Sequence, residues 1–90
     1  MVENRALGRQ VIEAMIQALR PHVCEFSWAE NVSRDTYLLS MTGRLRLRID
    51  QGAVDQAADQ ENAHTGLRMK IEEALQMSES GSAIGFVTQA

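Results

Sequence analysis

The sequence predicts a two-layer α+β sandwich with a three-stranded antiparallel meander, in the order α-β-β-β-α. Two segments carry apolar residues at three- and four-residue steps, as amphipathic helices do. The runs between them alternate apolar and polar residues, which is typical of strands with one buried face. The chain has 90 residues, enough for one small domain with one core. We therefore expect a single domain over residues 1–82, followed by a strand or docking tail over 83–90.

Composition limits the function classes. The net charge is −3, whereas a dedicated nucleic-acid-binding domain is usually basic. The single cysteine, Cys24, allows no internal disulfide and suits a reducing compartment. No apolar run approaches the roughly 20 residues that span a bilayer, and charged residues interrupt the N-terminal segment. We expect a cytoplasmic protein that does not insert into a membrane.

The first element is a helix from Glu3 to Leu19. Its apolar stripe consists of Leu7, Val11, Ile12, Met15, Ile16 and Leu19. Pro21 ends the helix because it lacks the N–H that a helix interior requires. Gly8 costs about 1 kcal/mol of helix propensity relative to alanine, which indicates either close packing there or a looser first turn.

A strand follows from Val23 to Ala29, and a hairpin occupies Thr36 to Asp50. Cys24, Phe26 and Trp28 share the apolar side of the first strand. The hairpin turns at Thr42-Gly43, with an apolar face on both arms. The whole apolar face of the meander consists of Phe26, Trp28, Tyr37, Leu39, Met41, Leu45, Leu47 and Ile49.

The C-terminal half is less regular. Residues 51–66 form either a weak helix, capped by Asp50, or a polar loop. Leu67 to Met77 has helical periodicity and should be the second helix covering the sheet. The last apolar run, Ile84 to Val87, is a candidate to pair with a sheet edge, either its own or that of a neighbouring chain.

The predicted element order resembles that of double-stranded-RNA-binding domains, which read the shape and phosphates of RNA. Those domains open their second helix with a lysine cluster. Here the segment Leu67 to Glu73 has two basic residues followed by two acids. The resemblance is therefore one of topology, and the chain is not assigned to that family.

The main candidate site is an arginine row on the second arm of the hairpin. Arg44, Arg46 and Arg48 alternate with apolar residues, so they share the face turned away from the core. Their spacing of about 6.6 Å suits successive carboxylates or phosphates. Three interpretations remain open: a solvated face paired with Glu25, a surface for an acidic protein, or a nucleic-acid surface.

Two further candidates concern the core and the edges. His22 and Cys24 are close in sequence, but two residues along a strand do not give nucleophile–base geometry, and Cys24 is expected in the core. The chain has too few soft ligands for a zinc site, and we expect no metal or cofactor. A three-stranded sheet has two open edges, which favours a homodimer with Ile84, Phe86 and Val87 at an interface.

The sequence shows no catalytic motif, so we expect no enzyme. The preferred function is a small protein-interaction module that acts as an adaptor, regulator or inhibitor of a larger complex. We expect it to be homodimeric. The first alternative is nucleic-acid binding through the arginine row. The second is a small-ligand carrier or enzyme that uses a helix–sheet pocket near Trp28, Tyr37 and His22.

Overall fold

The computed structural model describes residues 2–31, 34–43, 45–59, 65–81 and 84–88. Its elements in chain order are α1 (Val2–Leu19), β1 (Phe26–Asn31), β2 (Thr36–Met41), β3 (Arg46–Asp50), α2 (Gln51–Ala58), α3 (Thr65–Glu79) and β4 (Gly85–Val87). The α+β class and the antiparallel meander are confirmed. The helix α2 is one of the two alternatives predicted for residues 51–66, and β4 is the predicted possible C-terminal strand.

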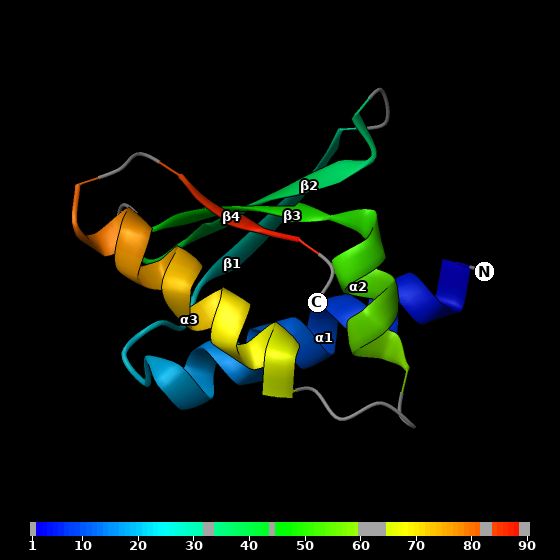
Figure 1. Ribbon diagram of the computed structural model, residues 1–90, viewed down its shortest axis with the longest axis horizontal. Helices are drawn as coiled ribbons and strands as arrows, with labels where there is room; N and C mark the ends of the chain where they lie inside the picture. Colours follow the sequence, from blue (N-terminus) through cyan, green and yellow to red (C-terminus); the bar gives the residue numbers. More distant parts are fainter. Residues whose placement is uncertain (1, 32–33, 44, 60–64, 82–83, 89–90) are drawn as a thin grey trace.

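The described strands form one mixed sheet in the order β1-β2-β3-β4. The three meander strands pair antiparallel, and β4 pairs with β3 in parallel. Figure 1 shows α1 and α3 side by side on one face of this sheet, with α2 at the end where β3 leads into it. The other face carries no described helix, so the molecule has two layers.

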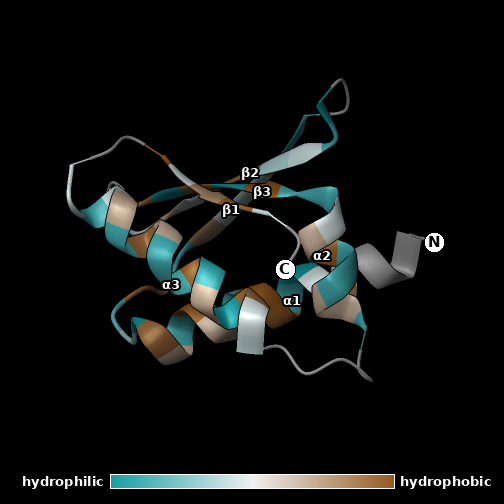
Figure 2. Ribbon diagram, in the orientation of Figure 1, coloured by the Kyte–Doolittle hydropathy of each residue, from teal (hydrophilic) through white to brown (hydrophobic). Residues whose placement is uncertain are grey.

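The core lies between the sheet and the helices. All eight residues of the predicted apolar face are buried or packed against the core, which confirms the predicted sides of the strands. The helices contribute Ile12 and Ile16 from α1, and Leu67, Ile71 and Leu75 from α3. Figure 2 shows hydrophobic and hydrophilic segments alternating along α1 and α3, as expected of helices with one buried face.

The segment that was ambiguous in sequence is helical over α2 (Gln51–Ala58), and Asp59 after it is extended. Asp50 is in extended conformation at the N-cap of α2 but makes no side-chain capping hydrogen bond. The buried side of α2 consists of Ala53, Val54 and Ala57. A Cβ added to Gly8 would lie 2.1 Å from the carbonyl oxygen of Val54. The lack of a side chain at Gly8 therefore lets α1 and α2 approach closely. Close packing was one of the two roles predicted for this glycine.

The first strand begins later than its alternation predicts. The Val23 N–H donates to the Arg20 carbonyl at 3.0 Å, which makes a turn after α1. The Cys24 and Glu25 N–H groups then both donate to Thr42 Oγ1, at 3.1 Å each. Because a side chain holds these amides, residues 23–25 lie outside the ladder and β1 starts at Phe26.

Candidate interaction surface

The face of the sheet turned away from the helices is the candidate site, and we call it the open face. Side chains of a strand alternate between faces, and paired residues share a face. On this face the pairings therefore give one row of paired residues that crosses all four strands, and a shorter row on each side of it. The open face consists of Ser27, Ala29, Asn31, Thr36, Leu38, Ser40, Arg46, Arg48, Asp50 and Phe86.

The central row joins a cation to two apolar side chains. Arg48 pairs with Leu38 on β2 and with Phe86 on β4. Its guanidinium carbon lies 6.0 Å from the centre of the Phe86 ring, within range of a cation–π contact. Phe86 keeps 57% of its surface exposed. The stacked arginine is thus held in place while its N–H donors stay on an accessible face.

The arginine row lies on the predicted face wherever it is described. Arg46 is exposed and Arg48 is half-buried, while Leu47 and Ile49, which alternate with them, are fully buried. The Arg46 backbone N–H donates to Ser78 Oγ at 3.2 Å, which ties the start of β3 to α3. Arg44 lies outside the described residues. Two cations of the row therefore belong to the open face.

Glu25 is not a cross-strand neighbour of these arginines. It is an exposed residue immediately before β1, and β2 lies between β1 and β3 in the sheet. Direct cross-strand pairs form only between adjacent strands, with Cβ atoms about 4.5–5.5 Å apart. The sheet order therefore gives no direct pairing between Glu25 and the arginine row.

The C-terminal residues join the chain's own sheet. Val87 is 1% exposed and belongs to the core, whereas Ile84 is half-buried and Phe86 is exposed. A Cβ on Gly85 would lie 2.1 Å from the Ala74 carbonyl oxygen, so β4 packs directly on α3. Of the two interface candidates that lie within β4, Phe86 is on the open face and Val87 is on the core face.

The environment of His22 and Cys24 differs from the prediction. Cys24 is exposed rather than in the core, and Val23 is fully buried in its place. The turn that delays β1 reverses which side chain faces inward. Cys24 Sγ lies 3.8 Å from Thr42 Oγ1, and His22 is exposed. These contacts leave the thiol beside a hydroxyl group at the surface.

Trp28 and Tyr37, near which a ligand pocket was considered, contact each other and side chains of α1. The Trp28 indole N–H donates to Glu13 Oε2 at 2.6 Å. The Trp28 and Tyr37 rings meet edge to face with centroids 5.8 Å apart, and the Arg9 guanidinium lies 5.7 Å from the Tyr37 centroid. These side chains pack on one another and fix α1 against β1 and β2.

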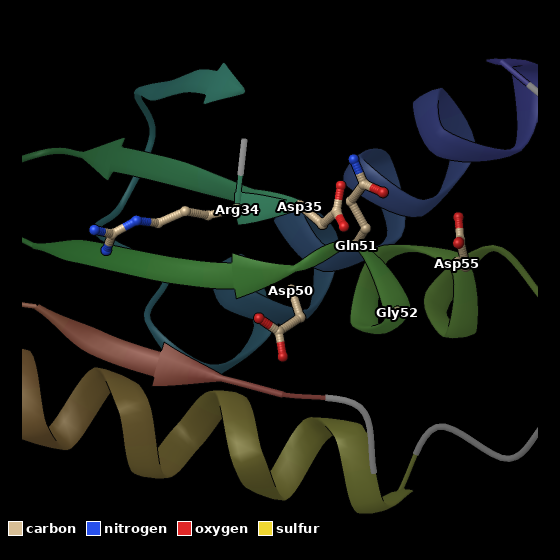
Figure 3. A pocket seen from close by; sticks show the side chains of 6 residues that line it. All are labelled: Arg34, Asp35, Asp50, Gln51, Gly52 and Asp55. Atoms are coloured by element: carbon tan, nitrogen blue, oxygen red, sulfur yellow. The ribbon is translucent and has the colours of Figure 1, made fainter. Parts of the chain in front are cut away.

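A pocket of about 490 Å³ lies where β3 leads into α2. Arg34, Asp35, Asp50, Gln51, Gly52 and Asp55 line it. Figure 3 shows the Arg34 guanidinium pointing away from the three carboxylates. The volume falls within the range of about 300–1,000 Å³ that is usual for ligand pockets. Its lining is polar and mostly anionic, unlike the largely apolar pockets that bind small molecules.

An ion pair joins the ends of α1 and α3. Arg20 Nε donates to Glu79 Oε2 at 2.8 Å, and Arg20 Nη2 donates to Glu79 Oε1 at 2.9 Å. The hydrogen bonds from Arg20 lower the pKa of the Glu79 carboxyl below its usual value, and the same pairing raises the pKa of Arg20. This fork is structural, because it lies in the helix layer and away from the open face.

Within the described ranges, no three His, Cys, Asp or Glu side chains lie together as a metal ion would need. Among the described helices, none has the length and apolar character required to cross a membrane. No family model matches the sequence, and neither a curated protein nor a solved structure matches the chain.

Proposed function

We propose that this chain is a small non-enzymatic protein-interaction module, a homodimer that acts in the cytoplasm as an adaptor, regulator or inhibitor of a larger complex. The observation that carries the proposal is the open face, where Arg48 stacks on the exposed Phe86 ring. Exposed aromatic and arginine side chains are the residue types that most often dominate the energy of protein interfaces.

The chemistry of the open face indicates its partner. Arg48 offers a planar set of donors that fits a carboxylate, and Arg46 adds a second cation on the same face. Phe86 and Leu38 flank Arg48 and favour an apolar group beside the acid. We therefore propose a protein partner that presents a carboxylate next to an apolar side chain.

The test compares two double variants in affinity capture from the native host, followed by mass spectrometry. Arg48→Ala combined with Phe86→Ser removes the stacked pair from the open face. Arg68→Ala combined with Met69→Ser makes matched changes on α3, where Arg68 is exposed and Met69 is 60% exposed. A partner captured by the wild-type chain should be lost from the first variant and retained by the second.

Circular dichroism first establishes that both variants fold. This control is needed because Arg48 is half-buried, whereas the limit of about 0.5 kcal/mol usual for surface substitutions applies to exposed positions. Equal capture by the wild-type chain and the open-face variant would contradict the proposed surface. Loss of capture by the α3 variant alone would assign the interaction to the helix layer instead.

Nucleic-acid binding is the second candidate, and the exposed Phe86 ring beside Arg48 is the observation that favours it. An aromatic ring on an open sheet face can stack a base while arginines contact the backbone. If Arg44, Arg46 and Arg48 all contact phosphates, log K should fall with log salt at a slope of about −2.1 on a single strand, from about −0.7 each, and of about −2.7 on a duplex, from about −0.9 each. Absence of binding at low salt, or binding unchanged in the triple alanine variant, would dismiss it.

A further inference from the structure

The two edge strands of the sheet, β1 and β4, differ in length and in how well their outer side is protected from pairing. One edge is β4, a strand of three residues held down on α3. The other edge is β1, which has six residues and pairs with β2 on one side. Natural sheets blunt their edges with short strands, proline, lysine or bulges. The edge at β4 is short, whereas β1 is twice as long, has no proline or lysine in its sequence FSWAEN and keeps an unbroken register with β2; Glu30 is its charged residue.

The hydrogen-bond pattern shows which groups of β1 face outward. The Met41 N–H donates to the Leu45 carbonyl, and the Gln51 N–H donates to the Asp35 carbonyl, so the odd-numbered residues of β2 face β3. In antiparallel strands the N–H and C=O of one residue point the same way, and successive residues alternate. The even-numbered residues of β2 therefore face β1.

These even-numbered residues of β2 pair with Ser27 and Ala29, which must point their backbone groups inward. The backbone groups of Phe26 and Trp28 consequently point away from the sheet. Both residues have half-buried side chains packed against the core, so an added strand would cover them further.

We propose that β1 pairs antiparallel with β1 of a second copy of the chain, joining two sheets into one of eight strands. The proposal rests on the homodimer of the proposed function and specifies its interface. A twofold axis perpendicular to the sheet places each residue opposite one on the same face, so the register must be centred on a residue. Every register of this kind brings outward-facing backbone groups together, and we place its centre at Trp28 because of the side chains that then face each other.

This register suits a second copy because it is self-complementary. Trp28 lies opposite Trp28 of the second copy, which is an aromatic cross-strand pair of the kind that stabilises sheets. Phe26 lies opposite Glu30 of the second copy. Glu30 is the charged residue of the strand, and the register keeps the two glutamates from facing each other, where like charges destabilise.

The test combines sedimentation equilibrium with amide hydrogen exchange by NMR, at about 10 μM and about 500 μM protein. The Phe26 and Trp28 amides should exchange about tenfold more slowly once 90% of the chains are dimeric, because exchange then proceeds from the remaining monomer. The Ser27 and Ala29 amides face β2 and serve as internal controls, because they should be protected at both concentrations.

A matched pair of proline variants gives a second measurement. Phe26→Pro removes an outward N–H at the first position of the strand, where proline is tolerated, and should give a folded monomer. This monomer should be less stable than the wild-type chain because the half-buried Phe26 side chain is lost as well. Ser27→Pro removes an N–H that faces β2 and should lower the stability of the monomer itself. If Phe26→Pro is dimeric to the same extent as the wild-type chain, the β1 interface is overturned.

The possible failures are distinguishable. A wild-type chain that stays monomeric at 500 μM overturns both this inference and the dimer of the proposed function. A dimer whose Phe26 and Trp28 amides exchange equally fast at both concentrations overturns the β1 interface and leaves the proposed dimer standing. Either result leaves the proposed open-face contacts standing, because the variants of Arg48 and Phe86 test those contacts within one chain.

Discussion

The close approach of α1 and α2 makes Gly8→Ala a sharp test of the fold. In an isolated helix this substitution would stabilise by about 1 kcal/mol, because alanine has the higher helix propensity. In this protein the new Cβ would lie 2.1 Å from the Val54 carbonyl oxygen and 2.9 Å from Val54 Cγ1. Ordinary van der Waals contact begins near 3.4 Å, so the helices must separate by more than 1 Å.

The steric effect should outweigh the propensity effect. The contact is with backbone, which cannot rotate away as a flexible side chain can. Overpacking a core costs about 1–3 kcal/mol, and moving α2 outward also exposes part of Val54, whose full burial contributes about 1.5–3 kcal/mol. After subtracting about 1 kcal/mol of propensity, we expect a net loss of about 2 kcal/mol. For a domain of this size that lowers Tm by about 8–16 °C.

Thermal and urea unfolding, followed by circular dichroism, measure this loss. Gln10→Ala is the matched control, because Gln10 is exposed on the same helix and its substitution should change stability by less than about 0.5 kcal/mol. A Gly8→Ala variant as stable as the wild-type chain, or more stable, would refute the packing of α1 on α2.

Three further contacts give predictions. Arg20 lowers the pKa of the Glu79 carboxyl in the folded chain. The ion pair therefore stabilises the fold above the unfolded-state pKa of Glu79, and this stabilisation is lost as pH falls through the lowered pKa. In urea unfolding, the wild-type chain should be more stable than Glu79→Gln by at most about 1 kcal/mol at neutral pH, and this difference should vanish in strong acid. Thr42→Val removes the acceptor of two backbone N–H groups and should cost about 1 kcal/mol in urea unfolding, whereas Thr42→Ser should recover most of it; equal losses in both would contradict this role. Glu13→Ala leaves the Trp28 indole N–H without its carboxylate and should cost about 1.5 kcal/mol and alter tryptophan fluorescence, while Glu13→Gln keeps an acceptor and should do less.

The periodic patterns of the sequence were sufficient to predict the layers of the fold. The alternation of Leu45, Leu47 and Ile49 with arginines fixes which side of β3 is buried, because every register that buries the apolar side exposes the charged one. The same reasoning failed for Cys24. The alternation of Cys24 with Phe26 predicts a longer strand. In the structure, the hydroxyl group of Thr42, 18 residues away, accepts the Cys24 backbone N–H instead, and no local sequence pattern reveals that contact.

The remaining elements depend on contacts that sequence periodicity does not encode. The apolar stripe of α2 consists of Ala53, Val54 and Ala57, which gives a weak signal because alanine is small. These residues are buried because Gly8 lets α1 come close. In the same way, Gly85 seats β4 on α3, and only that docking brings Phe86 beside Arg48. The arginines of the site were therefore predictable, whereas the aromatic partner of Arg48 was not.

The open face and the β1 edge together imply a geometry for binding. A twofold axis perpendicular to the sheet keeps both open faces on the same side of the eight-stranded sheet. The two β4 strands then lie seven strand spacings apart, about 34 Å at about 4.8 Å each. A dimer would thus present two Arg48–Phe86 pairs at opposite flanks of one surface, which suits a partner with repeated sites.

Dissociation rates from a surface coated with the partner test this arrangement. Two linked sites hold a partner far more tightly than one site, without any new contact. On a surface densely coated with the partner, Phe26→Pro should dissociate at least about tenfold faster than the wild-type chain, because the monomer has one open face. On a sparse surface, where each chain reaches one partner, the two should dissociate at similar rates. Equal dissociation from the dense surface would mean that the two open faces do not bind together, and a loss on both surfaces would mean that β1 contacts the partner directly.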